Sequence, residues 1–391
     1  MTTQPQSWPF YSDAEIHAVT RVLRSGKVNQ WTGPEVNDFQ DAFAAYIGAA
    51  HGVAVANGTV SLELILRAWG IGPGDEVVVT PRSFLASAST VAWVGATPVF
   101  ADIDPDTQTL SADTIAPVLT PNTKAILVVH LAGCPADMGP IMDLARAYDL
   151  RVLEDCAQAH GAAIDGVKVG TIGHAGSFSF CQDKIMSLGG EGGLVTTNNA
   201  EVFREVWELK DHGKSREAVF EREHPPGFRW LHEGLGTNLR MTGMQAAIGL
   251  EQLKQLDDWI AHRTRNATIL NKALQDLPAV RIPTVAPNKR HAWYKYYFFV
   301  RPEQLKSDWS RDRILAEMHD AGIPGLSGSC SEMYHEKVFQ KLNLVPPHTL
   351  PTAHQLGETS VMLLVDPAHS AERITQHAEI LTDILQRATK S

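Results

Sequence analysis

The chain has 391 residues, of which 44% are hydrophobic, and 34 Lys and Arg stand against 44 Asp and Glu, which gives a formal net charge of −10. This length and apolar content are enough for two domains with sizeable cores. The acidic balance argues against a nucleic-acid-binding surface, and no run of about 18 uncharged apolar residues indicates a membrane span.

The first residues, MTTQPQSWPFYSDAEI, contain neither a basic leader nor an apolar core, so we expect a cytoplasmic protein. The cysteines are scattered, without a CxxC pair or histidines at metal-ligand spacing; they are Cys134, Cys156, Cys181 and Cys330. This pattern predicts reduced thiols, and neither a disulfide framework nor a metal site.

Between residues 50 and 200, short β-rich runs alternate with segments of helical length. The runs are VAVAN, EVVVTP, TPVFADI, KAILVVH, RVLED, GSFSF and GLVTT, and the candidate helices lie near residues 59–70, 84–94, 111–119 and 137–149. The alternation is typical of a parallel sheet with crossover helices. The continuous apolar runs indicate strands buried on both faces.

The next segment, residues 211–241, is rich in turn residues and too long for an idle connection in a compact domain. We expect it to be a lid, part of a site or a subunit contact. From Thr242 onward, apolar residues at helical spacing predict one long helix of about eight turns that leads out of the large domain.

After Pro283 the pattern changes to a Tyr-rich strand, WYKYYFFV, followed by helical patterns around residues 310–321 and 370–388 with a turn-rich stretch between them. This order predicts a smaller α+β domain at the C-terminus. We place the large domain at residues 1–265 and the small domain at residues 266–391.

Two ionisable residues follow strands of the predicted sheet. Asp155 ends the run RVLED, and Lys184 comes shortly after GSFSF, in front of several glycines. Ligands of parallel α/β sheets bind beyond the carboxyl ends of the strands, although an Asp at that place can also merely cap a turn. A lysine placed in such a cleft is the usual amine nucleophile toward carbonyl groups.

A third feature is the segment VANGTVSLELILRAWG, which reads as a strand, a turn with glycine and a helix. The first turn of such a helix offers free N–H groups to an anion, although a plain helix start capped by Thr59 would look the same. A lysine, an acid and a phosphate cradle together suit pyridoxal 5′-phosphate (PLP), with the carboxylate paired to the pyridine nitrogen.

Several motifs occur in a fixed order along nearly the whole chain. They include GPEVNDFQDAFAAYIGA, NGTVSLELILRAWGIGPGDEVVVTP, GATPVFADIDPDT, EDCAQAHGA and GTNLRMTGMQAAIGLEQL. In this order they resemble the DegT/StrS-type PLP-dependent sugar aminotransferases, which have the aspartate-aminotransferase-like fold type I. The resemblance implies an α/β large domain, with a mostly parallel mixed sheet flanked by helices, and a small α+β domain.

The resemblance also implies roles for individual residues. Lys184 matches the lysine that binds the cofactor and carries a proton, and Asp155 and Gln158 match the partners of the pyridine nitrogen and the ring hydroxyl. Phe84 matches an aromatic stacked on the ring, unless it is an ordinary core residue. The phosphate contacts match Gly58, Thr59, Val60 and Ser179, of which Ser179 could equally be a strand-face hydroxyl.

Asn238, in GTNLRM, matches a residue that the family contributes from the neighbouring subunit, unless it is a plain turn Asn, so a homodimer with shared active sites is implied. Further candidates for substrate contacts are Arg240, His160, His212 and Tyr334, although basic loop residues are more often simply solvated. After HDAGIP the chain reads GLSGSCSEMYHEKVF, where many family members have a His-Tyr-Pro-like element. This stretch is either a subgroup-specific pocket or a capped helix start.

The implied reaction moves an amino group, through a pyridoxamine 5′-phosphate intermediate, from glutamate to a keto group of a dTDP- or UDP-linked deoxy sugar. Such amino sugars serve lipopolysaccharide and other surface polysaccharides, or glycosylated metabolites. Two alternatives stay open: a cyclitol or aminoshikimate-type aminotransferase, and a PLP-binding regulatory protein without turnover. The retained Lys184 and Asp155 favour an enzyme.

Overall fold

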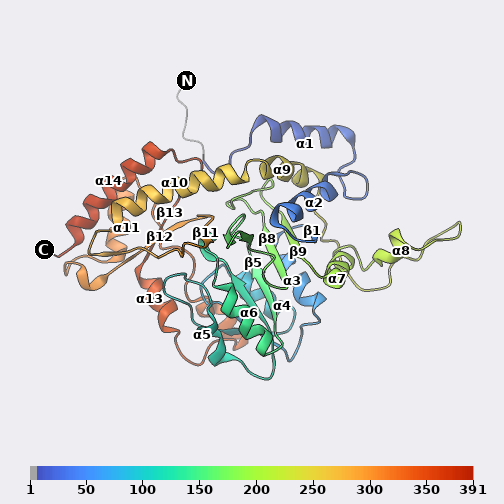
Figure 1. Ribbon diagram of the computed structural model, residues 1–391, viewed down its shortest axis with the longest axis horizontal. Coiled ribbons are helices and arrows are strands. Elements are labelled where there is room, and N and C mark those ends of the chain that lie inside the picture. The colour runs from blue at the N-terminus through green and yellow to red at the C-terminus, as the bar shows by residue number, and fades with distance from the viewer. Residues whose placement is uncertain (1–6, 391) are drawn as a thin grey trace.

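The computed structural model describes residues 7–390, and its centre is a seven-stranded sheet flanked by helices (Figure 1). In spatial order the strands are β1 (His51–Val55), β9 (Gly193–Thr197), β8 (Ala175–Ser179), β5 (Arg151–Asp155), β4 (Thr123–Val129), β2 (Glu76–Val79) and β3 (Thr97–Phe100). Neighbours from β8 to β3 are parallel, whereas β9 runs antiparallel to both β1 and β8. The expected mostly parallel mixed sheet is confirmed.

Alternate residues of the strands pack against helices on opposite faces of this sheet. In β4, Leu127 and Val129 belong to the core shared with α3 and α4, whereas Ile126 and Val128 contact the core under α6. Both sets are buried, as the uninterrupted apolar run predicted. Up to residue 210, the α-helices of the large domain are α1 (Asp13–Ser25), α2 (Glu35–Ile47), α3 (Gly58–Ala68), α4 (Ala86–Trp93), α5 (Ala112–Ile115), α6 (Met138–Ala147) and α7 (Ala200–Lys210).

Helix α3 begins two residues earlier than a Thr59 cap would require. The side chain of Asn57 accepts a hydrogen bond from the Val60 N–H at 3.1 Å, so Asn57 is the cap. The Thr59 side chain is therefore not used as the cap and is exposed on the first turn of α3.

The predicted single helix after Thr242 is wrong, because the chain forms α9 (Gly243–Leu253) and α10 (Leu256–Leu274) with a break between them. The first turns of α10 share a core with α9, and the later part of α10 faces the C-terminal core. Gly249 of α9 lies against Phe39 of α2, whereas Leu270 of α10 packs in the C-terminal core. A break of two residues preserves the helical spacing in the sequence, so periodicity alone did not detect it.

The C-terminal part has a second core around a three-stranded antiparallel sheet. Its strands, in spatial order, are β10 (Val280–Arg281), β12 (Tyr296–Val300) and β13 (Ser360–Leu363). The helices expected around residues 310–321 and 370–388 form as α11 (Arg311–Asp320) and α14 (Ala371–Ala388). The stretch between them also contains α12 (Lys337–Leu342) and α13 (Pro351–Thr359). The proposed domain boundary after residue 265 falls inside α10.

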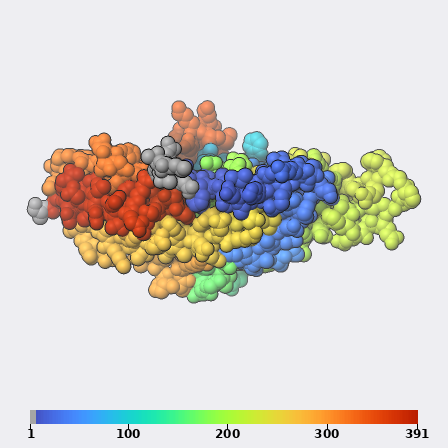
Figure 2. Space-filling model, turned by 90° about the horizontal axis from the view of Figure 1, so that it is seen from above, coloured from blue at the N-terminus to red at the C-terminus, as the bar shows by residue number. Residues whose placement is uncertain are grey.

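A small third sheet ties the two parts together: β11 (Lys289–Arg290) pairs with β6 (Ala163–Ile164), which pairs with β7 (Val167–Lys168). Residues 211–241 form α8 (Arg216–Phe220) and a segment, here called the arm (residues 221–236), that projects from the large domain at the far end from α14 (Figures 1 and 2). Among the described residues, no helix has both the length and the apolar character needed to cross a membrane.

Candidate active site

A cavity of about 860 Å³ lies beyond the carboxyl ends of β5 and β8, next to the start of α3. This is the edge of the sheet where ligands of parallel α/β folds bind. Eight residues singled out in the sequence line it together: Gly58, Thr59, Val60, Phe84, Asp155, Gln158, Ser179 and Lys184.

Lys184 lies on the loop that follows β8. Its carbonyl oxygen accepts a hydrogen bond from the Trp8 indole N–H at 2.8 Å, and its Nζ lies 3.4 Å from the Tyr294 hydroxyl oxygen. The side chain is largely buried and lines the cavity. The amine is therefore held by the protein and faces the space where a ligand would sit.

Asp155 ends β5 with its side chain buried beside the cavity. Burial raises the pKa of this carboxyl, and the Ala157 N–H and the Ser87 hydroxyl oppose the rise. These two donors lie 3.1 and 2.8 Å from the carboxylate oxygens. A buried carboxylate fixed in this way gains most from a cationic partner in the cavity.

Gln158 is oriented by the backbone of the neighbouring loop. Its Oε1 accepts a hydrogen bond from the Ala132 N–H at 2.7 Å, and Ala132 has the left-handed φ of 57°. Because its carbonyl oxygen is occupied, the amide N–H groups are the part left to bind a ligand oxygen.

The start of α3 and the end of β8 approach each other closely. A Cβ built on Gly58 would lie 2.5 Å from the Ser179 Cβ, which is a distance that real Cβ atoms do not show. Only glycine allows this approach, which brings the Ser179 hydroxyl next to the free N–H groups of the first helical turn. Such a cradle suits a phosphate group.

Phe84 is 69% exposed, although it is a large apolar side chain on the wall of the cavity. It is therefore not an ordinary core residue. Its open ring face is available to stack on a planar aromatic ligand.

The family model of the DegT/DnrJ/EryC1/StrS aminotransferase family matches residues 10–382. The chain belongs to this family. It is 38% identical over 81% of its length to the GDP-perosamine synthase of Caulobacter vibrioides, covering 79% of that protein. It is 41% identical over 74% of its length to the L-glutamine:2-deoxy-scyllo-inosose aminotransferase of Streptomyces lividus, covering 69% of that protein.

Among solved structures, an aminotransferase from Psychrobacter cryohalolentis is similar, with a TM-score of 0.96 and 48% sequence identity, covering 98% of this chain and 99% of that one. Members of the DegT/DnrJ/EryC1/StrS family are PLP-dependent, and the chain is accordingly a PLP-dependent aminotransferase. When bound, PLP supplies an aldehyde for amines and a pyridinium ring that withdraws electrons.

The cavity fits this cofactor at three separate points. The glycine cradle at Gly58 would hold a phosphate, the buried carboxylate of Asp155 would accept a pyridinium N–H, and the amine of Lys184 would meet an aldehyde carbon. All three groups line the same cavity, which satisfies the spatial demand of one rigid molecule.

Two predicted substrate residues lie in the core instead. His160 is fully buried between Phe178 and Phe180, and Tyr334 packs edge-on against Phe100 and donates a hydrogen bond to the Glu332 carboxylate at 2.5 Å. Neither lines the cavity. Their role in substrate binding stays a prediction.

Three more candidates lie at the base of the arm. Arg240 forms an ion pair with Asp211 at 2.7 Å, Asn238 pairs with Asp211 through the backbone, and His212 is exposed. None of them lines the cavity of the same chain.

The opposite wall of the cavity comes from the stretch where the chain departs from the family pattern. Its cavity-lining residues are Leu326, Gly328, Ser329, Cys330, Met333 and Glu336. This stretch is therefore a pocket wall that also contains a short helical turn (η4, Met333–His335). The sequence analysis missed Ser87 and Tyr294, because their partners Asp155 and Lys184 lie 68 and 110 positions away.

Within the described residues, His130, Glu154 and Cys156 form a buried cluster of the kind that binds metals. The His130 Nδ1 accepts the Ala136 N–H, so its Nε2 donates to Glu154 at 3.0 Å. Glu154 also accepts three backbone N–H groups of residues 170–173. These hydrogen bonds satisfy the buried side chains of the cluster and hold the loop of residues 170–173 in place, which accounts for the cluster without a metal.

Proposed function

We propose that the protein transfers an amino group from glutamate to the keto group of a dTDP- or UDP-linked deoxy sugar. The observation that carries the proposal is the convergence of Lys184, Asp155 and the α3 cradle on one cavity. A volume of about 860 Å³ leaves room for a sugar beside the cofactor. The curated relatives include a GDP-perosamine synthase, whose name refers to a nucleotide-linked amino sugar.

In this proposal Lys184 holds the cofactor and then, as a free amine, moves a proton at the carbon that gains or loses nitrogen. Asp155 keeps a proton on the pyridine nitrogen, and Phe84 stacks on the ring. The Gln158 amide donates a hydrogen bond to the hydroxyl oxygen of the ring and so orients it. Ser179 and the backbone of Thr59 and Val60 bind the phosphate.

We also propose a homodimer in which Asn238 serves the active site of the other subunit. Support comes from the arm, where Phe228, Trp230 and Leu235 are 78%, 83% and 94% exposed. Exposed aromatic and aliphatic side chains on a projecting segment are typical of a subunit contact.

The second candidate function is amination of a keto-cyclitol. It is favoured by the 41% identity to the 2-deoxy-scyllo-inosose aminotransferase, whose name gives glutamine as the donor. Both candidate functions use the same cofactor residues. They differ in the amino acceptor and the amino donor, so a test of these two compounds distinguishes them.

The first test is reduction of the PLP-loaded protein with borohydride, followed by peptide mass spectrometry. We expect the cofactor on Lys184, and we expect Lys184→Ala to lose it while the exposed Lys254→Ala control retains it. Attachment to another lysine would contradict the assignment.

The second test offers dTDP-, UDP- and GDP-linked keto sugars and 2-deoxy-scyllo-inosose, each with glutamate or glutamine. We expect amination of a dTDP- or UDP-linked keto sugar with glutamate. Amination of the cyclitol alone would select the second candidate, and no turnover with any pair would favour a binding protein.

A further inference from the structure

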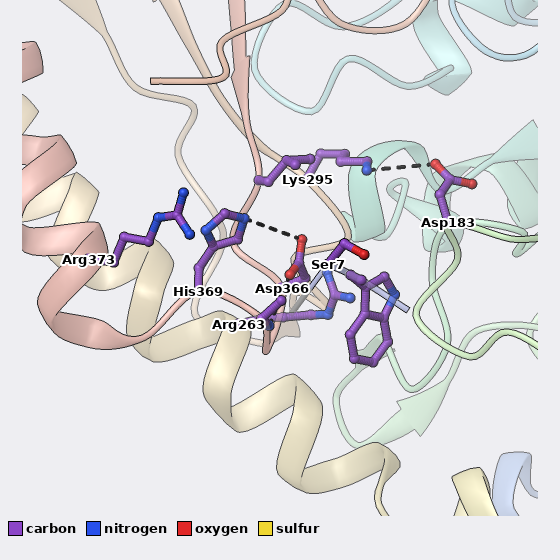
Figure 3. Close-up of a pocket in the computed structure, with 10 residues that line it drawn as sticks. Ser7, Asp183, Arg263, Lys295, Asp366, His369 and Arg373 are labelled. Atoms are coloured by element: carbon purple, nitrogen blue, oxygen red, sulfur yellow. Dashed lines mark hydrogen bonds and ion pairs between the residues drawn. The ribbon is translucent and has the colours of Figure 1, made fainter. Parts of the chain in front are cut away.

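Tyr294 connects the amine of Lys184 to a half-exposed carboxylate. Its hydroxyl oxygen lies 3.4 Å from the Lys184 Nζ, and its O–H donates a hydrogen bond to Asp183 Oδ2. The same carboxylate has Lys184 Nζ at 3.7 Å and Lys295 Nζ at 3.7 Å. Figure 3 shows Lys295 reaching toward Asp183 along one side of a second, smaller cavity.

The protonation states of this network follow from its surroundings. Burial and the negative charge of Asp183 raise the pKa of Tyr294 well above its usual value. Burial alone would raise the pKa of Asp183, but Lys184, the Tyr294 hydrogen bond and Lys295 together lower it. The phenol is therefore neutral beside a carboxylate, so its one proton points to Asp183 and its lone pairs face the amine of Lys184.

The backbones on both sides of this contact are fixed by one stacked pair of side chains. The Arg263 Nη1 donates to the carbonyl oxygen of Tyr294 at 3.1 Å, and the Trp8 indole donates to that of Lys184 at 2.8 Å. The Arg263 guanidinium lies 5.1 Å above the Trp8 ring. The distance between the amine and the phenol is thus set by a packed frame.

We propose that Tyr294 relays protons between the amine of Lys184 and solvent. A surplus proton leaves Lys184 Nζ for the Tyr294 hydroxyl oxygen, while the proton of that hydroxyl moves to Asp183. Asp183, whose side chain is 54% exposed, then releases it to water. The reverse sequence returns a proton, so charge and atoms balance without another reactant.

The relay matters because a lysine attacks a carbonyl only as a neutral amine. Its effect rests on the proposed role of Lys184 in holding the cofactor. The charged and titratable groups around the relay are Asp155, His160, Cys181, Arg263, Tyr297 and Asp366, besides Asp183, Lys184 and Lys295 themselves.

The test measures how fast cofactor-free protein attaches PLP, followed by the absorbance of the bound cofactor. Tyr294→Phe keeps the ring and removes the hydroxyl, and we expect attachment to slow at least about tenfold, the lower end of what acid–base help contributes. Tyr296→Phe is the matched control, since it removes a buried phenol two positions further along the chain, where the hydroxyl donates to Asn271 at 2.9 Å. We expect the control to attach PLP at the wild-type rate.

Two further measurements separate the relay from a structural effect. Added imidazole, a soluble proton carrier, should restore the rate of Tyr294→Phe and leave Tyr296→Phe unchanged. Asp183→Asn should also slow attachment, because an amide accepts no proton.

Equal rates for Tyr294→Phe and Tyr296→Phe, or a wild-type rate for Asp183→Asn, would overturn the relay. If mass spectrometry still finds PLP on Lys184 in that case, the proposed function stands. If PLP is found elsewhere, the proposed function fails instead.

Discussion

His160 is an ionisable residue whose environment keeps it neutral. Its ring stacks between Phe178 and Phe180 at centroid distances of 5.8 and 5.3 Å. Burial, assisted by the positive charge of Lys184, lowers the pKa of His160 to about 3. In the unfolded chain the same imidazole has the ordinary value near 6.5, so acid stabilises the unfolded state through this residue.

The consequence is measurable as a pH dependence. The contribution of neutral His160 to the free energy of unfolding is present above about pH 6.5 and is lost as the pH falls toward the folded pKa. The loss amounts to about 2 kcal/mol at pH 5. Lowering the pH from 7.5 to 5 should reduce the free energy of unfolding of both proteins. We expect the reduction in His160→Phe to be about 2 kcal/mol smaller than in wild type, as measured by urea titrations of the cofactor-free proteins.

The exposed His17 on α1 provides the control, and His17→Phe should retain the wild-type pH dependence. If His160→Phe shows the same loss as wild type, His160 titrates in the folded protein and our account of its burial is wrong. A loss of turnover with unchanged PLP binding would return His160 to the list of substrate contacts.

At the scale of elements, the site depends on how closely helix α3 approaches strand β8. The missing side chain of Gly58 lets the helix start rest on Ser179. The sequence predicted the strand, the helix and their order, because hydrophobic pattern and turn residues are local signals. It did not identify the cap Asn57, although an Asn before a helix is a local capping signal. It did not predict the break between α9 and α10, because a break of two residues leaves the helical spacing unchanged.

Substituting Gly58 should loosen the cofactor more than the fold. In Gly58→Ala the new Cβ meets Ser179 at 2.5 Å, and overpacking of this kind costs about 1–3 kcal/mol. If this cost falls on cofactor binding, the dissociation constant of PLP rises about 5- to 150-fold, which absorbance titration measures.

Gly139→Ala is the matched control, since a Cβ on this exposed glycine of α6 meets nothing within 4 Å. It should bind PLP as wild type does. Wild-type affinity in Gly58→Ala would show that the phosphate is not bound at the start of α3.

At the scale of the whole molecule, the arm and its base contain candidate site residues that do not reach the cavity of their own chain. Asn238, Arg240 and His212 lie outside the cavity of their own chain. The sequence could predict which candidate cofactor residues lie together on the cavity, because they belong to local motifs near strand ends and a helix start. It could not predict Tyr294 or Trp8 as neighbours of Lys184, since these contacts join distant segments with no motif of their own. Asp183 is next to Lys184 in the sequence, but its contact with Tyr294 is again a long-range one.

Shared active sites predict complementation between two defective subunits. Lys184→Ala homodimers and Asn238→Ala homodimers should each have little activity. In a mixture at equal amounts, half of the dimers are hybrids with one intact site each, so about a quarter of all sites recover.

The measurement is turnover after subunit exchange, with hybrid formation checked by mass spectrometry of tagged subunits. If hybrids form without any recovery of turnover, Asn238 acts in the active site of its own chain. A monomer by analytical ultracentrifugation would reject the dimer itself.

The antiparallel strand β9 has a consequence for how the protein is made. Residues 51–55 of β1 pair with residues 193–197 of β9, and Gly58 rests on Ser179. During translation the nascent chain therefore cannot complete the floor of the cavity until about half of it has left the ribosome, and Tyr294 emerges later still. We therefore expect the cofactor to bind only after both halves of the chain have been synthesised.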